Sequence, residues 1–303
     1  MKKLWSLCFV LLVSLAFVAQ ASAAGRLFHT NEPNGTIEEL NPDTGAVVNS
    51  FPAPIPIGDG CSALAFANNR LFFQNCGSGI YELNPSTGAV VNSFPSPSLN
   101  IDGLGFSGTE LYLQEYAVGV ADAAKSGSAA PYARPVADGI SPNVVQPLPV
   151  SSAVHVLNPD TGATIRTLTL SVPVVGGLSY AGGRNTLFAT DVNSNTVYEL
   201  NPTTGAVIHS FTPPVPDVYG VGYSFGRKTL FLGDVGGLGT IFEVNPDTGA
   251  VIHTLPVVPN WGLAADENGA AAVPAINEWG MALFTALAGL VAFYYLRRRK
   301  RAA

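Results

Sequence analysis

Short apolar runs recur along residues 25–270, and a polar or glycine-containing turn separates each run from the next. In one stretch the runs ALAFA (63–67), RLFFQN (70–75), GIYELN (79–84) and AVVNSF (89–94) follow one another closely. Runs of four to eight residues rich in β-branched and aromatic side chains are typical of β-strands. The pattern therefore predicts four short antiparallel strands, which we name A, B, C and D in chain order.

One phrase, exemplified by ELNPDTGAVVNSF, occurs in five near-copies. The spacings between the copies are 43, 74, 43 and 44 residues, measured between Asn41, Asn84, Asn158, Asn201 and Asn245. A period near 43 residues with four strands in each period is the signature of a β-propeller blade. Within the phrase, Pro suits the second position of a turn and Gly accepts a positive φ, so NPxTG is predicted to be the C–D turn.

The two ends of the repeat region complement each other. Residues 26–51 supply strands B, C and D, whereas GLAAD (262–266) supplies a strand A with no partner after it. Closure of a ring removes exposed sheet edges, so we expect the last strand to complete the first blade. The predicted fold class is all-β: a five-bladed β-propeller over residues 25–272. The strand order resembles the NHL and YVTN propeller families, a resemblance that implies the fold and no activity.

Residues 116–152 interrupt the repeat between strands B and C of the third blade. The other B–C connections have only a few residues, and loops of this length are usually functional or disordered. The B–C and D–A connections share one face of a propeller. We therefore predict a binding face where this insertion emerges.

The N-terminal residues 1–24 have the organisation of a secretory signal peptide. Lys2 and Lys3 precede an apolar core at 4–18, and Ala21, Ser22 and Ala23 form a small-residue cleavage site. The sequence therefore predicts export across the inner membrane.

Residues 279–296 form an uncharged run of 18 residues, followed at once by five basic residues at 297–301. Such a run is long enough to span a bilayer, and the basic cluster is expected to stay in the cytoplasm. The sequence predicts one C-terminal transmembrane helix with the bulk of the chain outside. By this pattern alone, the segment is an ordinary tail anchor.

The residues around the start of this run carry a further resemblance. The segment resembles the start of the IPTLxxWG-CTERM sorting signal of Gram-negative bacteria through Val273, Pro274, Glu278, Trp279 and Gly280. Ala275 and Ile276 replace the usual Thr and Leu. The resemblance assigns residues 273–303 to a sorting domain and implies an exosortase-type enzyme as a partner.

Cys61 and Cys76 flank the A–B hairpin of the second blade. If Asn68 and Asn69 form a two-residue turn, the two cysteines lie opposite each other at a separation that permits a disulfide. An exported chain meets an oxidising compartment, so we predict this disulfide. A turn of another length would break the register.

Five equivalent positions at the ends of the B strands carry Asn31, Asn75, Glu115, Asp191 and Asp234. A polar ring with three carboxylates suits Ca²⁺ or a cationic ligand. The alternative is that these side chains cap the B–C turns. No other cofactor is predicted, and the identity of any metal is left open.

The histidines do not form a catalytic motif in the sequence. His29, His155, His209 and His253 each occupy a repeat position, and no Ser-His-Asp or H-E-x-x-H grouping is visible. Residues 25–272 contain eight Lys and Arg against twenty Asp and Glu, a formal charge of −12. This balance favours cations or basic partners and argues against nucleic acid.

These observations predict an exported, non-catalytic propeller that acts as a binding module. It would be held in the inner membrane by its C-terminal helix and then sorted to the cell surface or the extracellular space, with an envelope or extracellular ligand still unknown. The alternative is a periplasmic propeller enzyme, a lyase or hydrolase, with its site on the face that carries the insertion.

Overall fold

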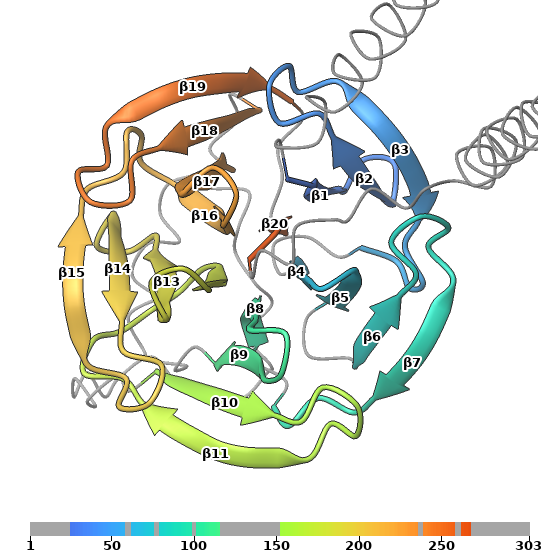
Figure 1. Ribbon diagram of the computed structural model, residues 1–303, viewed down its shortest axis with the longest axis horizontal. Coiled ribbons are helices and arrows are strands. Elements are labelled where there is room, and N and C mark those ends of the chain that lie inside the picture. Colours follow the sequence, from blue (N-terminus) through green and yellow to red (C-terminus); the bar gives the residue numbers. More distant parts are fainter. Residues whose placement is uncertain are drawn as a thin grey trace, which may run out of the picture. The chain divides into compact units, whose positions relative to one another are not determined.

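The computed structural model describes residues 25–57, 62–75, 79–98, 101–115, 152–235, 239–257 and 262–267. These residues belong to the compact unit 23–271 and form twenty β-strands in five four-stranded antiparallel sheets (Figure 1). The all-β, five-bladed fold class is confirmed. The predicted signal peptide, the predicted transmembrane helix and the insertion up to residue 151 lie outside the described residues.

Each blade contains its strands in the order A to D, from the centre to the rim. Blade 1 contains β20 (Leu263–Ala265), β1 (Leu27–Asn31), β2 (Thr36–Leu40) and β3 (Val47–Pro52). Blade 2 contains β4 (Ser62–Ala67), β5 (Arg70–Asn75), β6 (Ile80–Leu83) and β7 (Val90–Phe94). Blade 3 contains β8 (Ile101–Phe106), β9 (Leu111–Glu115), β10 (Ala153–Leu157) and β11 (Thr164–Thr169). Blade 4 contains β12 (Leu178–Ala181), β13 (Thr186–Asp191), β14 (Thr196–Leu200) and β15 (Val207–Phe211). Blade 5 contains β16 (Val218–Ser224), β17 (Thr229–Asp234), β18 (Thr240–Val244) and β19 (Val251–Pro256).

The predicted ring closure is confirmed. The last strand, β20, pairs antiparallel with β1, with Ala265 opposite Leu27 and Leu263 opposite His29. The first blade is therefore built from both ends of the repeat region. With this closure, the inner strand of each of the five blades pairs with the second strand of the same blade.

The antiparallel order gives the ring two different faces. The turn face carries the A–B connections, such as Asn68 and Asn69, and the NPxTG turns. The loop face carries the B–C and D–A connections, including the site of the insertion after Glu115. Gly25 precedes a B strand and Glu267 follows an A strand, so both lie at the turn face.

Large apolar side chains fill the space between neighbouring blades. Phe72 of blade 2 packs edge-on against Phe106 of blade 3, with ring centroids 4.9 Å apart. Nearer the axis the backbones of neighbouring inner strands lie in close contact. A Cβ added to Gly103 would lie only 2.5 Å from the amide nitrogen of Leu178. Aromatic packing thus gives way to glycine contacts toward the centre.

The NPxTG prediction is confirmed in all five blades, and blade 1 shows the geometry. The Oδ1 of Asn41 accepts the backbone N–H groups of Asp43 and Thr44 at 2.9 and 3.1 Å. Gly45 has φ +72°, and the closing glycines of the other four turns have φ between +70° and +72°. The Asn side chain and the Gly conformation together define the turn.

Each NPxTG turn lies on the outer strand of the preceding blade. A side chain of that outer strand donates a hydrogen bond to a turn carbonyl over 2.9 to 3.3 Å. The five pairs are Asn49 to Ser86, Asn92 to Asp160, Arg166 to Pro202, His209 to Asp247 and His253 to Asp43. The fifth pair returns to blade 1, so the series of contacts is closed.

In blades 1, 2, 4 and 5, an arginine beside the start of the B strand reinforces the same contact. Arg227, for example, forms a bidentate pair with Glu243 of its own blade at 2.8 and 2.9 Å, and it reaches Asp43 in the next turn at 2.8 Å. Arg70 and Arg184 make the corresponding contacts to Asp160 and Asp247. The three arginine side chains are only partly exposed. Each forms a salt bridge within its own blade and a second one to the next blade.

Blade 3 achieves the same link with the charges exchanged. Its B strand is preceded by Glu110 instead of Arg, and its D strand carries Arg166 instead of Asn or His. The two form a bidentate pair, and Arg166 still reaches the carbonyl oxygen of Pro202. The hydrogen bonds from Arg166 lower the pKa of Glu110 despite its partial burial.

The turn glycines are expected to tolerate no side chain. A Cβ on Gly88 would lie 2.4 Å from the ring of Phe51 in the preceding blade, and Gly88 also has φ +72°. We expect Gly88→Ala to lower the free energy of unfolding by about 2–4 kcal/mol, through left-handed strain and overpacking together. Urea unfolding followed by fluorescence measures this change.

Gly35→Ala is the matched control, because Gly35 has φ +64° but has no neighbour within 4 Å of an added Cβ. It should cost only about 1 kcal/mol, the strain of the left-handed backbone. Equal losses in the two variants would contradict the proposed packing of the turn on Phe51.

Candidate binding face at the loop end of blades 2 and 3

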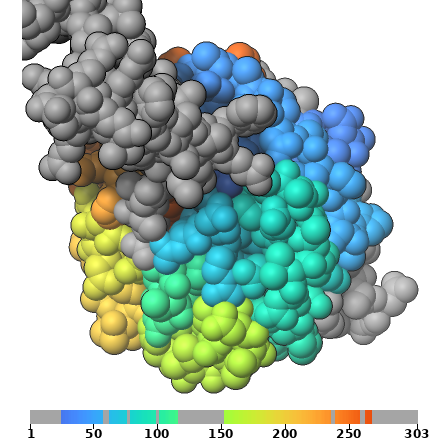
Figure 2. Space-filling model, turned by 45° about the vertical axis from the view of Figure 1, so that its right-hand side comes forward, coloured from blue at the N-terminus to red at the C-terminus, as the bar shows by residue number. Residues whose placement is uncertain are grey.

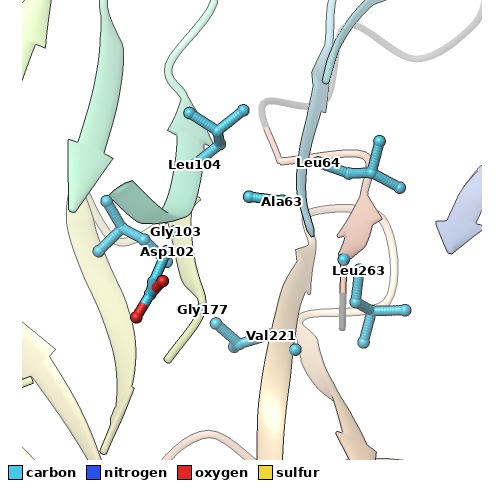
Figure 3. A pocket seen from close by; sticks show the side chains of 11 residues that line it. Ala63, Leu64, Asp102, Gly103, Leu104, Gly177, Val221 and Leu263 are labelled. Atoms are coloured by element: carbon cyan, nitrogen blue, oxygen red, sulfur yellow. The ribbon is translucent and has the colours of Figure 1, made fainter. Parts of the chain in front are cut away.

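The axis of the ring is closed to ligands at the described residues. The inner strands bring together mainly Gly, Ala, Leu and Val side chains, with Asp102 as the charged exception (Figure 3). The space between them does not admit a water molecule. A binding site in the described part of the chain must therefore lie on a face and not in the centre.

Glu267 seals the turn-face end of the axis, and sequence analysis did not identify it. Its carboxyl oxygens accept hydrogen bonds from the backbone N–H of Phe106 and, at 2.8 Å, from the Ser179 hydroxyl. Its own backbone bonds Phe66 and Gly182. The residue is completely buried, and it joins blades 2, 3 and 4. A charged residue after the closing strand resembles an ordinary exposed turn, so the sequence held no signal for this role.

Three of the five predicted ring residues bond groups in the connections at the loop face. Asn31 and Asp191 accept backbone N–H groups within their own B–C turns, from Asn34 and Ser194. Asn75 donates to the carbonyl of Pro56, which belongs to the D–A connection passing over it. Four of the five are buried, namely Asn31, Asn75, Asp191 and Asp234.

The contacts of Asn31 and Asp191 agree with the turn-capping alternative. Within the described segments, no three His, Cys, Asp or Glu side chains are grouped in a way that could hold a metal ion. The structure does not bring the ring residues together, and cation binding by the ring stays a prediction.

Glu115, the fifth ring residue, is the partly exposed member, and it forms a polar cluster at the base of the insertion. Its Oε2 bonds the Nε2 of His155 at 2.8 Å, and its Oε1 accepts a short hydrogen bond from the Ser98 hydroxyl. Burial tends to raise the pKa of Glu115, but the bonds from Ser98 and His155 outweigh it and lower that pKa. The carboxylate is therefore ionised at neutral pH.

The order of this cluster does not match nucleophilic catalysis. A serine nucleophile needs the imidazole beside it, with a carboxylate orienting the far side of the ring. Here the carboxylate stands between Ser98 and His155, and the other ring nitrogen faces the hydroxyl of Thr167 at 3.2 Å. The arrangement suits recognition of a polar or cationic group more than activation of Ser98.

A groove is lined by residues that lie close to Ser98 in the sequence. Its volume is about 270 Å³, and its lining comes from the loop-face end of the outer strands of blade 2: Gly79, Tyr81, Ser93, Phe94 and Pro95. The D–A connection runs from Pro95 to Ser98, so it links the groove to the polar cluster. Figure 2 shows the first three blades, from blue to yellow-green, as neighbouring sectors of one side of the surface. We call the groove together with Ser98, Glu115 and His155 the loop-face site.

The remaining histidines have structural contacts. His29 is almost completely buried and bonds Glu38 at 3.1 Å, and burial lowers its pKa, so the ring is neutral at pH 7. His209 and His253 make the contacts between blades described above.

The register around the predicted disulfide is partly visible. Asn68 and Asn69 form the expected two-residue turn with φ +51° and +60°, and the pairing extends to Ser62 opposite Asn75. Cys61 precedes Ser62 and Cys76 follows Asn75, so the two cysteines occupy the next positions of this register. Both lie outside the described residues. The turn length is confirmed, and the disulfide stays a prediction.

Comparisons with known proteins bear on the fold and on the tail. Residues 271–299 match the family model described as the IPTL-CTERM motif, which confirms the predicted sorting motif. The chain matches no curated protein. A similar solved structure is glutaminyl cyclase from Myxococcus xanthus, with 15% identity and a TM-score of 0.47 over 66% of this chain and 72% of that chain. Another is a protein of unknown function from Bacteroides caccae, with 10% identity and a TM-score of 0.43 over 76% and 72%.

At these identities the similarity concerns the fold alone. The chain is a five-bladed β-propeller, and it carries an IPTL-CTERM sorting motif at residues 271–299. None of the described segments forms a helix with the length and apolar character needed to cross a membrane.

Glu267 generates a pH-dependent prediction. Burial raises the pKa of its carboxyl well above the ordinary value, so the native state keeps a proton that the unfolded chain releases above about pH 4.5. The stability that the protonated group contributes is complete below that pH and falls as the pH rises toward the folded pKa. Glu267→Gln removes the titration, so the wild-type chain should lose stability relative to this variant by up to about 1.4 kcal/mol per pH unit.

Urea unfolding of both chains between about pH 5 and pH 8 measures this difference. Thr203→Ser, a substitution of an exposed neutral residue, is the control and should give the same pH dependence as the wild-type chain. Parallel curves for the wild-type chain and Glu267→Gln would contradict the buried, protonated state.

Proposed function

We propose that this chain is a surface-displayed propeller that binds an envelope or extracellular ligand through its loop face and performs no chemistry. The fold and the sorting motif indicate an exported surface protein. The observation that carries the proposal is the polar cluster of Ser98, Glu115 and His155 on the loop face, where the repeat is interrupted.

The loop face also offers the features of a recognition surface. It combines the groove beside Tyr81 with the ionised Glu115 and the polar groups of Ser98 and His155. Concave surfaces with a few fixed polar groups are common ligand sites. The strongly acidic balance of residues 25–272 favours a cationic or basic ligand.

An exosortase-type enzyme is the proposed processing partner. The IPTL-CTERM motif is consistent with this processing, and residues Val273, Pro274, Glu278, Trp279 and Gly280 are the proposed recognition positions. The inner membrane is the proposed site of attachment before sorting.

The loop-face proposal predicts a specific loss of binding. We expect removal of residues 118–150 together with Glu115→Gln to weaken binding to purified cell-wall sacculi or outer-membrane vesicles of the host by about tenfold, since both changes alter the loop face. Pull-down with a dilution series of the full chain measures this affinity. Lys228→Asn alters an exposed residue on the turn face and is the control. Unchanged binding by the deletion chain, or an equal loss in Lys228→Asn, would remove the loop face as the site.

The sorting proposal predicts a change in mass. The chain recovered from host cells should lack both the signal peptide and the residues after the cleavage point in the motif, whereas Trp279→Ala should retain its tail. Intact mass spectrometry of the two chains measures this difference. A wild-type chain that keeps residues 279–303 would identify the segment as a plain anchor.

A further inference from the structure

The groove in blade 2 is lined by residues that share one face of the sheet. Tyr81 pairs with Ser93, and Gly79 and Pro95 lie two residues further toward the loop face on the same two strands. Side chains alternate across a strand, so residues two apart project from the same face. Phe94 contributes its backbone carbonyl oxygen, which would lie 3.7 Å from a Cβ added to Gly79. The lining is therefore held by the two outer strands of a single blade.

Gly79 opens the groove, because every other blade carries a side chain at this position. The register of the B and C strands gives the equivalent residues, which are Thr36, Ala153, Thr196 and Thr240. A Cβ added to Gly79 would lie 3.6 Å from both Cε2 and the hydroxyl oxygen of Tyr81, an ordinary contact distance. A threonine would therefore fit beside the tyrosine ring and fill part of the groove.

Blade 4 has the same tyrosine without the glycine. Tyr198 is the equivalent of Tyr81, and Thr196 stands where blade 2 has Gly79. The Thr196 hydroxyl donates to the carbonyl oxygen of Ser194 at 3.1 Å, and the Ser194 hydroxyl lies 3.5 Å from that of Tyr198. The tyrosine of blade 4 is therefore accompanied by side chains of its own B–C turn.

The lining of the groove indicates the chemistry of its occupant. It combines the partly exposed ring of Tyr81 with the hydroxyl groups of Tyr81 and Ser93, and none of its described residues is charged. An aromatic face packs against C–H groups, and a hydroxyl can both donate and accept a hydrogen bond. A sugar ring offers C–H groups on its faces and hydroxyls at its edge. The formal charge of −12 on residues 25–272 disfavours acidic sugars.

The size and rigidity of the groove fit one sugar unit. Its volume of about 270 Å³ is just below the roughly 300–1,000 Å³ of typical small-molecule pockets. The Tyr81 ring packs against the apolar cluster that contains Phe51 of blade 1 and Leu64 of blade 2. A ring already held by packing loses little freedom when a ligand binds. The groove therefore suits one ring of a larger glycan.

We propose that the groove of blade 2 is a carbohydrate subsite, in which one uncharged sugar ring of an envelope or extracellular glycan stacks on Tyr81 and bonds the hydroxyl of Ser93. The inference rests on the proposed binding at the loop face and names the class of the ligand. The acidic balance of the chain, which favours a cationic ligand, then concerns parts of the glycan outside the groove.

Saturation-transfer NMR of the detergent-solubilised full chain tests the proposal, with the methyl glycosides of glucose, galactose, mannose and N-acetylglucosamine as probes. At least one glycoside should receive saturation mainly at the C–H protons of one ring face, because that face lies on Tyr81. Titration of the same glycoside gives its dissociation constant. Gly79→Thr, which fills the groove, and Tyr81→Ala, which removes the ring, should each weaken binding about tenfold.

Tyr198→Ala is the matched control, since it removes the equivalent ring from a blade that has Thr196 in place of the glycine. It should leave the dissociation constant unchanged. Gly79→Thr introduces the residue that blades 1, 4 and 5 carry, and circular dichroism checks the fold of each variant. The proposal would be overturned by no transfer to any of the four glycosides, by unchanged binding in a folded Gly79→Thr chain, or by an equal loss in Tyr198→Ala.

Failure of this inference is distinguishable from failure of the proposed function. A chain that binds sacculi or vesicles through residues 118–150 and Glu115 but binds none of the glycosides would overturn the carbohydrate subsite and leave the loop-face proposal in place. A glycoside bound in the groove, with binding to sacculi and vesicles unaffected by the deletion, would have the opposite meaning.

Discussion

The contact between each NPxTG turn and the outer strand of the preceding blade is the interaction on which the ring depends. Neighbouring sheets of a propeller splay apart toward the rim, so packing between their faces weakens with distance from the axis. The turns compensate there, because each places a glycine on an apolar side chain and accepts a hydrogen bond, as Gly88 does over Phe51 and Ser86 does from Asn49. The repeated phrase is therefore conserved within the chain for assembly of the blades, and no ligand is needed to explain it.

The sequence predicted the features that depend on local chemistry or on the repeat. Pro and Gly determine the conformation of the NPxTG turn within a few residues, and the orphan strand GLAAD could only complete the blade that lacked a strand A. The side-chain partners were harder to predict. Arg227 and Asp43 are 184 residues apart, and the closure of the ring alone makes them neighbours. Burial of Glu267 depends on blades 2, 3 and 4 together, which no local pattern reveals.

The candidate site could likewise be predicted only in part, because the repeat gave the positions but not the side-chain partners. The repeat alignment correctly identified the ends of the B strands as equivalent positions on one face. It did not show that Asn31 and Asp191 are engaged by their own turns, while Asn75 holds the D–A connection. Glu115 bonds Ser98 of the D–A connection and His155 of the neighbouring C strand. Partners of the same two kinds occur in other blades, because Asn75 bonds Pro56 of a D–A connection and Asn31 bonds Glu38 of its neighbouring C strand.

The position of Glu267 has a mechanical consequence. The chain passes from the ring toward the sorting motif through the residue that seals the axis, and not through a strand on the rim. Tension applied to the segment after Glu267 acts first on hydrogen bonds to Phe66, Phe106 and Ser179, which belong to three different blades. Beyond these, it acts along β20, whose bonds to β1 are loaded together instead of opening one at a time. A load on this segment is therefore shared by strands at the centre of the propeller, and the outer strands are not peeled from their sheets.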